Sequence, residues 1–125
     1  MWTHILLIAV AGALGSVCRW ALSMGVARLA GGSFPWATAS VNLIGSLAFG
    51  IAWGLGQHHW GAQTRVAVLV GFMGAFTTFS SFAFDNYRLG IDGAWGALVA
   101  NMVGQTLLGL GALTFGIWLV SRTST

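Results

Sequence analysis

The stretch GFMGAFTTFSSF, residues 71–82, is the part of the sequence that decides the fold. It lies inside a long apolar segment, yet it carries four hydroxyl side chains, Thr77, Thr78, Ser80 and Ser81, among glycines and phenylalanines. In the hydrocarbon of a membrane every polar group needs a partner. Hydroxyls at this depth therefore either bridge packed helices or line a path for a polar solute.

The amino-acid composition indicates that this stretch lies in a membrane. Hydrophobic residues make up 57% of the 125 positions and charged residues only 6%, a balance typical of integral membrane proteins. Crossing ~30 Å of hydrocarbon takes about 20 helical residues. The apolar segments of that length are residues 3–26, 35–55, 65–84 and 94–120. We therefore predict an all-α membrane protein, with residues 1–125 forming a single domain of four transmembrane helices.

Short polar segments connect the predicted spans, at residues 28–34, 57–64 and 85–93. Asp85 and Asp92 fall in the third connection, where we interpret them as ordinary solvated charges. The chain has no glutamate, so no carboxylate relay crosses the membrane and proton-coupled transport is disfavoured.

The positive charges are five scattered arginines, with no lysine. They form no basic stripe, so we expect no nucleic-acid partner. With four spans, Arg65 and Arg122 lie on one side of the membrane, and Arg28 and Arg88 lie on the other. This even distribution gives the positive-inside rule no preferred orientation, so we predict dual topology.

Dual topology predicts an antiparallel homodimer. One bundle of four helices fills its interior with side chains and encloses no pore. In an antiparallel pair, a residue at mid-depth in one copy can meet its own counterpart. Gly74 lies near the centre of the third span, and a helix break there would place freed backbone carbonyls where they could hold a cation.

The second span carries small or polar residues at every fourth position from Asn42 to Gly54. We interpret Ser46, Gly50 and Gly54 as a ridge that permits close helix packing. Asn42 differs, because an amide this far inside the hydrocarbon must be partnered or functional.

Three stretches of the sequence form a recognisable set: GALGSVCRW at residues 12–20, ATASVNLIGSLAFG at residues 37–50, and the stretch at residues 71–82. Together they resemble the Fluc (CrcB) family of small fluoride channels. The resemblance covers nearly the whole chain in length, order and layout of spans. It implies a passive fluoride channel built as an antiparallel dimer with two pores.

The resemblance also implies roles for individual residues. Phe79 and Phe82 would line the fluoride pathways, and Asn42 would face them. The backbone carbonyls of Gly74 and Thr77 would hold a central sodium ion (Na+).

These assignments agree with the chemistry of fluoride, which is small and tightly hydrated and needs close donors in place of water. Candidate donors are the amide of Asn42 and the hydroxyls of Thr78, Ser80 and Ser81. The positive edges of the two phenylalanine rings can also contact an anion. The alternative for both rings is a place in the core or against lipid.

Three further residues keep more than one interpretation. Arg19, which is characteristic of the family, either reaches the interface, sets the potential at a pore mouth or makes a structural contact. Asn101 and Gln105 share a helix face and either continue the path or join helices. Family members often carry tyrosine and serine on this face, so the chain departs from the pattern there.

We therefore expect passive fluoride export across the plasma membrane, in a prokaryote the inner membrane, which lowers cytoplasmic fluoride toxicity. The partners are fluoride, a second copy of the chain and membrane lipid. One alternative is a small four-helix dimeric exporter of cationic compounds, which would need a glutamate in its first helix. Another is a non-transporting membrane scaffold. An enzyme is disfavoured, because no nucleophile is paired with a base and no metal cluster is evident.

Overall fold

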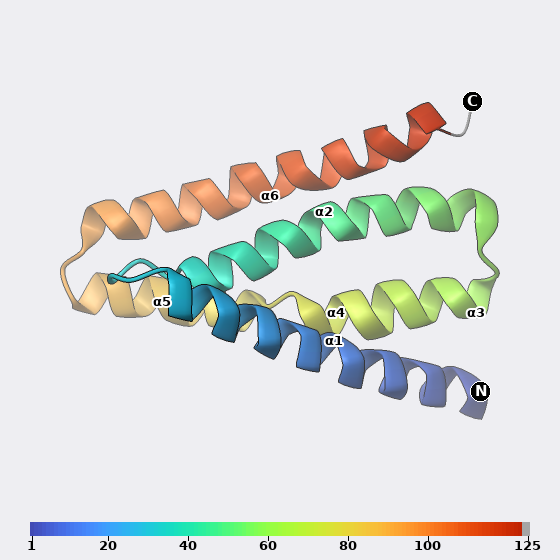
Figure 1. The fold of residues 1–125 in the computed structure, drawn as a ribbon. Helices are drawn as coiled ribbons and strands as arrows, with labels where there is room; N and C mark the ends of the chain where they lie inside the picture. Colours follow the sequence, from blue (N-terminus) through green and yellow to red (C-terminus); the bar gives the residue numbers. More distant parts are fainter. Residues whose placement is uncertain (124–125) are drawn as a thin grey trace.

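The computed structural model describes residues 1–123, and helices account for most of them. The elements in chain order are α1 (Trp2–Leu29), α2 (Trp36–His59), α3 (Ala62–Arg65), η1 (Val66–Met73), α4 (Gly74–Phe76), α5 (Phe79–Ile91) and α6 (Trp95–Thr123). Within residues 1–123, four segments are long and apolar enough to cross a membrane: α1, α2, the composite segment Ala62–Ile91, and α6. The prediction of an all-α protein with four membrane-spanning helices is confirmed (Figure 1).

The third span is the irregular one. It begins with α3, continues as the π-helix η1, in which each hydrogen-bonded turn holds an extra residue, and ends its first half with α4. Thr77 and Thr78 then have extended backbone conformations, with ψ angles of 156° and 112°. We call these two residues the helix break. The predicted interruption is therefore present, and it lies directly after the three-residue helix that starts at Gly74.

Small residues allow α2 and α6 to pack with their backbones in contact. A Cβ atom on Gly50 would overlap the carbonyl oxygen of Leu113, and one on Gly116 would lie 2.6 Å from the carbonyl oxygen of Leu47. A Cβ on Gly54 would meet the side chain of Val120. The predicted packing ridge of the second span is confirmed, and α6 is the helix it packs against.

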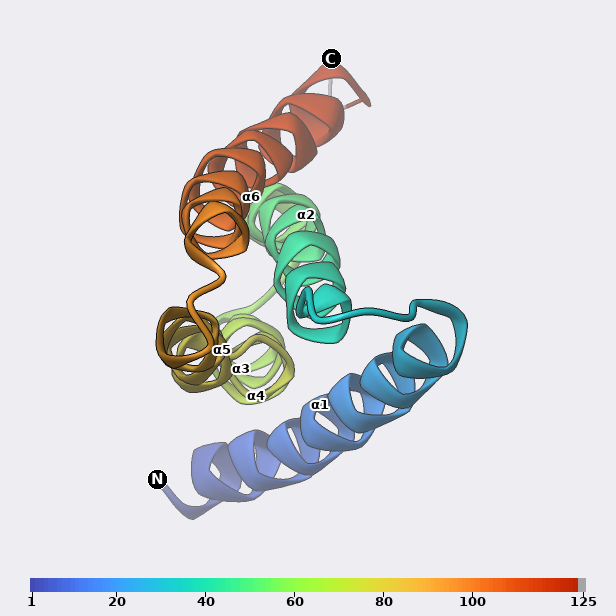
Figure 2. The same cartoon turned by 90° about the vertical axis from the view of Figure 1, so that its left-hand side faces the viewer.

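The helix α1 packs across η1 in the same way. A Cβ atom on Gly15 would overlap the backbone of Phe72, and one on Gly71 would lie 2.9 Å from the Cβ of Ala11. Figure 2 shows the result from the end of the bundle, with α1 crossing beneath the third span and α6 lying beside α2. The third span is thus held between α1 on one side and α2 on the other.

The connection predicted at residues 85–93 is wrong for most of its length, because α5 continues to Ile91. Its first polar residues follow one another around the helix: Tyr87 and Arg88 are exposed, whereas Asp85 and Asn86 are half-buried and Leu89 is 4% exposed. Asp85 is also not a solvated loop charge. Its Oδ2 atom is buried and has no hydrogen-bond partner within residues 1–123, whereas Asp92 is exposed as predicted.

Candidate functional site

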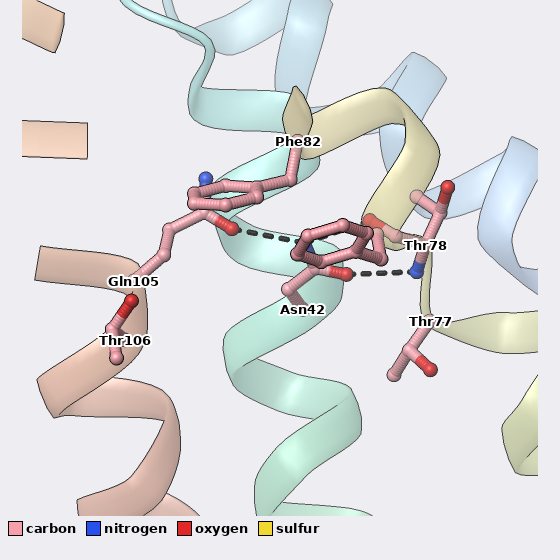
Figure 3. A pocket seen from close by; sticks show the side chains of 7 residues that line it. Asn42, Thr77, Thr78, Phe82, Gln105 and Thr106 are labelled. Atoms are coloured by element: carbon pink, nitrogen blue, oxygen red, sulfur yellow. Dashed lines mark hydrogen bonds between the residues drawn. The ribbon is translucent and has the colours of Figure 1, made fainter. Parts of the chain in front are cut away.

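The helix break is held in place by the side chain of Asn42 on α2. The Thr78 backbone N–H donates to Asn42 Oδ1 over 2.9 Å, and Asn42 Nδ2 donates to the Thr78 carbonyl over 3.1 Å. In a continuous α-helix the Thr78 N–H would donate to the carbonyl of Gly74. One amide from a neighbouring helix therefore bonds to both backbone groups of a residue that has left the helix. Figure 3 shows the bond between the Thr78 nitrogen and the Asn42 oxygen.

Thr78 is also the N-cap of α5. Its Oγ1 atom accepts a hydrogen bond from the Ser81 backbone N–H at 3.2 Å, which in a continuous helix would donate to the carbonyl of Thr77. Thr78 Oγ1 also donates to Ser81 Oγ at 3.1 Å and lies 3.2 Å from Ser80 Oγ. The carbonyls of Gly74 and Thr77 have thus both lost the donors of a regular helix.

A series of amide hydrogen bonds runs outward from Asn42. Asn42 Nδ2 donates to Gln105 Oε1 (2.9 Å), Gln105 Nε2 donates to Asn101 Oδ1 (2.8 Å), and Asn101 Nδ2 donates to Asn86 Oδ1 (2.9 Å). Asn101 has no solvent exposure. The series joins α2, α6 and α5, so Asn101 and Gln105 both connect helices, which was one of their two predicted roles.

A cavity of about 270 Å³, which we call the first cavity, lies beside this series. The rings of Phe79 and Phe82 form one part of its wall, with centroids 5.7 Å apart and planes at 43°. Phe79 is 80% exposed in the single chain. Gln105 also lines the cavity, whereas Asn101 does not. The complete lining is Asn42, Thr77, Thr78, Phe79, Phe82, Gln105 and Thr106.

A second cavity of about 310 Å³ lies between α1, α2 and the helix break. Thr78 lines both cavities, and Arg19 lines the second one. No carboxylate of the described chain lies within ion-pair distance of Arg19, so its charge is not neutralised locally. The complete lining is Ser16, Arg19, Trp20, Ser23, Thr38, Val41, Thr78 and Ser81.

The candidate residues chosen from the sequence do not all lie in the same part of the structure. Most of them line one of the two cavities, but Asn101 lies buried behind Gln105, and Ser80 is exposed beside Thr78. Gly74 also lines neither cavity. It is exposed, and the nearest atom to a Cβ placed on it is a carbonyl oxygen of its own span, 3.9 Å away.

Sequence reasoning missed four polar residues of this region. Three of them follow a helical spacing that could have revealed them. Thr38 precedes Asn42 by four positions, and Ser16 and Ser23 lie three positions before and four positions after Arg19, on the same helix faces. The fourth, Asn86, carries no comparable signal.

Comparison with known proteins assigns the chain to a family. The family model described as CrcB-like protein, Camphor Resistance (CrcB), matches residues 6–117. The chain belongs to the CrcB family. The resemblance stated from the three sequence stretches is therefore confirmed.

Curated relatives of this CrcB-family chain match it over nearly its whole length. It is 47% identical over 115 residues to a protein of Nitratidesulfovibrio vulgaris, covering 90% of this chain and 93% of the relative. It is 43% identical to one of Nitrosococcus oceani, covering 93% and 94%, and 40% identical to one of Nitrobacter winogradskyi, covering 95% and 96%. Each of these relatives is named a fluoride-specific ion channel, FluC.

Proposed function

We propose that this CrcB-family chain is a fluoride-selective channel of the plasma membrane, through which fluoride leaves the cytoplasm passively. The observation that carries the proposal is the 40–47% identity, over nearly the full length, to relatives named as fluoride-specific ion channels. The same relatives do not favour a cation exporter or a scaffold. The first span also lacks the glutamate that such an exporter would need.

The two cavities fit a route for a small anion. They meet at Thr78, which lines both. Arg19 brings a positive charge to the second cavity, where an anion would enter from water. Phe79 and Phe82 line the first cavity with aromatic rings, whose edges attract anions, and there the anion would lose most of its water. Thr78, Ser80 and Ser81 form a cluster of hydroxyls between the two.

The working unit in this proposal is an antiparallel homodimer. A single chain leaves the first cavity open and Phe79 80% exposed, and a second copy would cover both. The balanced arginines support insertion in both orientations. Reporters fused to the C-terminus test the orientation: signals from both sides of the membrane are expected, and a signal from one side alone would refute dual topology.

The centre of the dimer would hold a sodium ion on the carbonyls of Gly74 and Thr77. These carbonyls fit a hard cation, because they are oxygen ligands without their usual helical donors. Gly74 is open on its outer side, where the copy from the second subunit would lie. Bound there, sodium would supply positive charge that stabilises the two broken helices against each other.

Growth of fluoride-sensitive bacteria tests the proposed function in cells. A strain without its own fluoride exporter should regain growth in millimolar fluoride when it expresses this chain. Equal expression of the Phe82→Ile variant should not restore growth. If the wild-type chain is present in the membrane and gives no protection, the proposal of fluoride export is wrong.

A further inference from the structure

We propose that the side-chain amide that donates to the anion in the first cavity is that of Gln105, and that Asn42 serves to position it. This inference rests on the proposed function, since it names the donor for the fluoride that the channel carries. It also revises the prediction from the sequence, in which Asn42 supplied the amide N–H.

The amide of Asn42 has no hydrogen left for an anion. Its Nδ2 group carries two hydrogens, and these are donated to the Thr78 carbonyl (3.1 Å) and to Gln105 Oε1 (2.9 Å). Its Oδ1 atom accepts from the Thr78 N–H at 2.9 Å. Freeing one N–H of Asn42 would break its bond either to the Thr78 carbonyl or to the Gln105 amide.

The hydroxyls that line the first cavity are also engaged. A hydroxyl has a single hydrogen to donate. Thr77 and Thr106 donate theirs to helix carbonyls, at 3.1 and 2.7 Å, and Thr78 donates its hydrogen to Ser81 Oγ at 3.1 Å. Each of these side chains would have to break a bond within the chain before it could donate to an anion.

Gln105 is different, because it has two amide hydrogens and one assigned bond. Nε2 donates to Asn101 Oδ1 at 2.8 Å, and within residues 1–123 its second hydrogen has no partner. Gln105 lines the first cavity together with Phe79 and Phe82, and Figure 3 shows it reaching from α6 toward Asn42. An anion in this cavity would accept the remaining amide N–H of Gln105 and lie beside the two phenylalanine rings, whose edges attract negative charge.

The orientation of the Gln105 amide follows from the backbone of the helix break. The Thr78 N–H can only donate and its carbonyl can only accept, so Asn42 must turn its oxygen to the first and its nitrogen toward the second. The remaining Asn42 hydrogen then requires the oxygen of Gln105, which leaves Nε2 as the donor to Asn101. Reversing the Gln105 amide would place two donors against each other.

Asn86 completes the series as its last acceptor. It receives the Nδ2 hydrogen of Asn101, which has no exposed surface and no access to water. All three asparagines of the chain, Asn42, Asn86 and Asn101, lie in this one series with Gln105. We therefore assign Asn86 as a positioning residue that acts through Asn101 and Gln105.

Fluoride efflux from liposomes tests the donor. Gln105→Met keeps the length of the side chain and removes its amide, and Gln57→Met is the same change at an exposed site. Losing a hydrogen bond to a charged group should slow fluoride efflux about tenfold or more in Gln105→Met, with the wild-type rate in Gln57→Met. A wild-type rate in Gln105→Met would overturn the inference, whereas wild-type protein that does not conduct would overturn the proposed function itself.

Nuclear magnetic resonance of the wild-type protein gives a test that does not depend on the folding of a channel variant. The chain has three glutamines, at positions 57, 63 and 105, so the Gln105 amide signals can be assigned by elimination with Gln57→Met and Gln63→Met. Adding sodium fluoride, with sodium chloride as the control, should shift one of the two Gln105 amide protons. A fluoride shift at the Asn42 amide with Gln105 unchanged would overturn the inference.

Variants of Asn86 test the positioning role. Asn86→Leu removes the terminal acceptor and should slow fluoride efflux, whereas Asn86→Asp retains an acceptor oxygen and should restore it. Combining Asn86→Leu with Gln105→Met should be no slower than Gln105→Met alone, because both changes act through one amide. Additive losses, or a wild-type rate in Asn86→Leu, would overturn the role assigned to Asn86.

Discussion

The side-chain oxygen of Asn42 lies 2.9 Å from the backbone nitrogen of Thr78, at the point where the third span leaves the helical conformation. Non-helical backbone at membrane depth is tolerated only where its polar groups find partners within the protein. Asn42 provides both partners for Thr78, and so makes the helix break compatible with the membrane. The break, in turn, frees the carbonyls of Gly74 and Thr77 and brings Thr78 to the wall of both cavities.

Asn42→Leu should therefore destabilise the protein as well as stop conduction. It leaves the Thr78 N–H without its acceptor and removes the amide that donates to the Thr78 carbonyl, and an unsatisfied buried polar group costs about 1–3 kcal/mol. The apparent melting temperature in detergent should fall. Thr114→Val is the control, because its hydroxyl bonds only to carbonyls of its own helix on an exposed face. An Asn42→Leu protein that melts like the wild type would contradict the anchoring role.

The close contact between α2 and α6 can be tested with two matched glycines. Gly116→Ala places a methyl group 2.6 Å from the Leu47 carbonyl oxygen, whereas Gly111→Ala on the same helix meets nothing within 4 Å. Overpacking of this kind costs about 1–3 kcal/mol, so Gly116→Ala should lower the melting temperature. Gly111→Ala should leave it unchanged or raise it slightly, because alanine favours helix. Equal effects of the two changes would disprove the close approach of these backbones.

Replacing either pathway phenylalanine should abolish conduction without preventing assembly. Phe79→Ile and Phe82→Ile remove the positive ring edges while keeping apolar bulk. Size-exclusion chromatography should still show a dimer, and fluoride efflux from liposomes should stop. Phe115→Ile on the exposed side of α6 serves as the control and should conduct normally. Normal efflux in both pathway variants would remove the two rings from the route.

Exchange of sodium for a large organic cation should lower the stability of the folded dimer. A ligand that binds only the folded state stabilises it by about 2.7 kcal/mol at a concentration of 100 times its Kd. The melting temperature should therefore be higher in sodium chloride than in choline chloride of equal ionic strength. If the two salts give the same melting temperature over a wide concentration range, sodium does not bind at Gly74 and Thr77.

The sequence was most informative where a single physical rule applied. The lengths of the apolar segments predict the spans, the four-residue spacing of Ser46, Gly50 and Gly54 predicts close packing, and an amide at the depth of Asn42 predicts a partner. The identity of that partner could not be predicted from the sequence, because Thr78 lies 36 positions away and the contact exists only in the tertiary structure.

The prediction was wrong at the end of the third span, because it inferred a loop from the polarity of the residues there. Polar residues from Asp85 onward were interpreted as a loop, whereas the helix α5 continues through them to Ile91. That error concealed Asn86, which is placed opposite Asn101 only because the helix continues. The π-helical turns of η1 were also not predicted, since the apolar sequence Val66–Met73 is equally compatible with an α-helix.

The most direct test of fluoride-selective conduction is ion efflux from liposomes that contain the purified protein, loaded with potassium fluoride or potassium chloride in the presence of sodium. An ion-selective electrode records release after valinomycin removes the limiting membrane potential. The fluoride-loaded liposomes should empty rapidly, while the chloride-loaded ones retain their contents. Retention of fluoride, or equal release of both anions, would contradict a fluoride-selective channel.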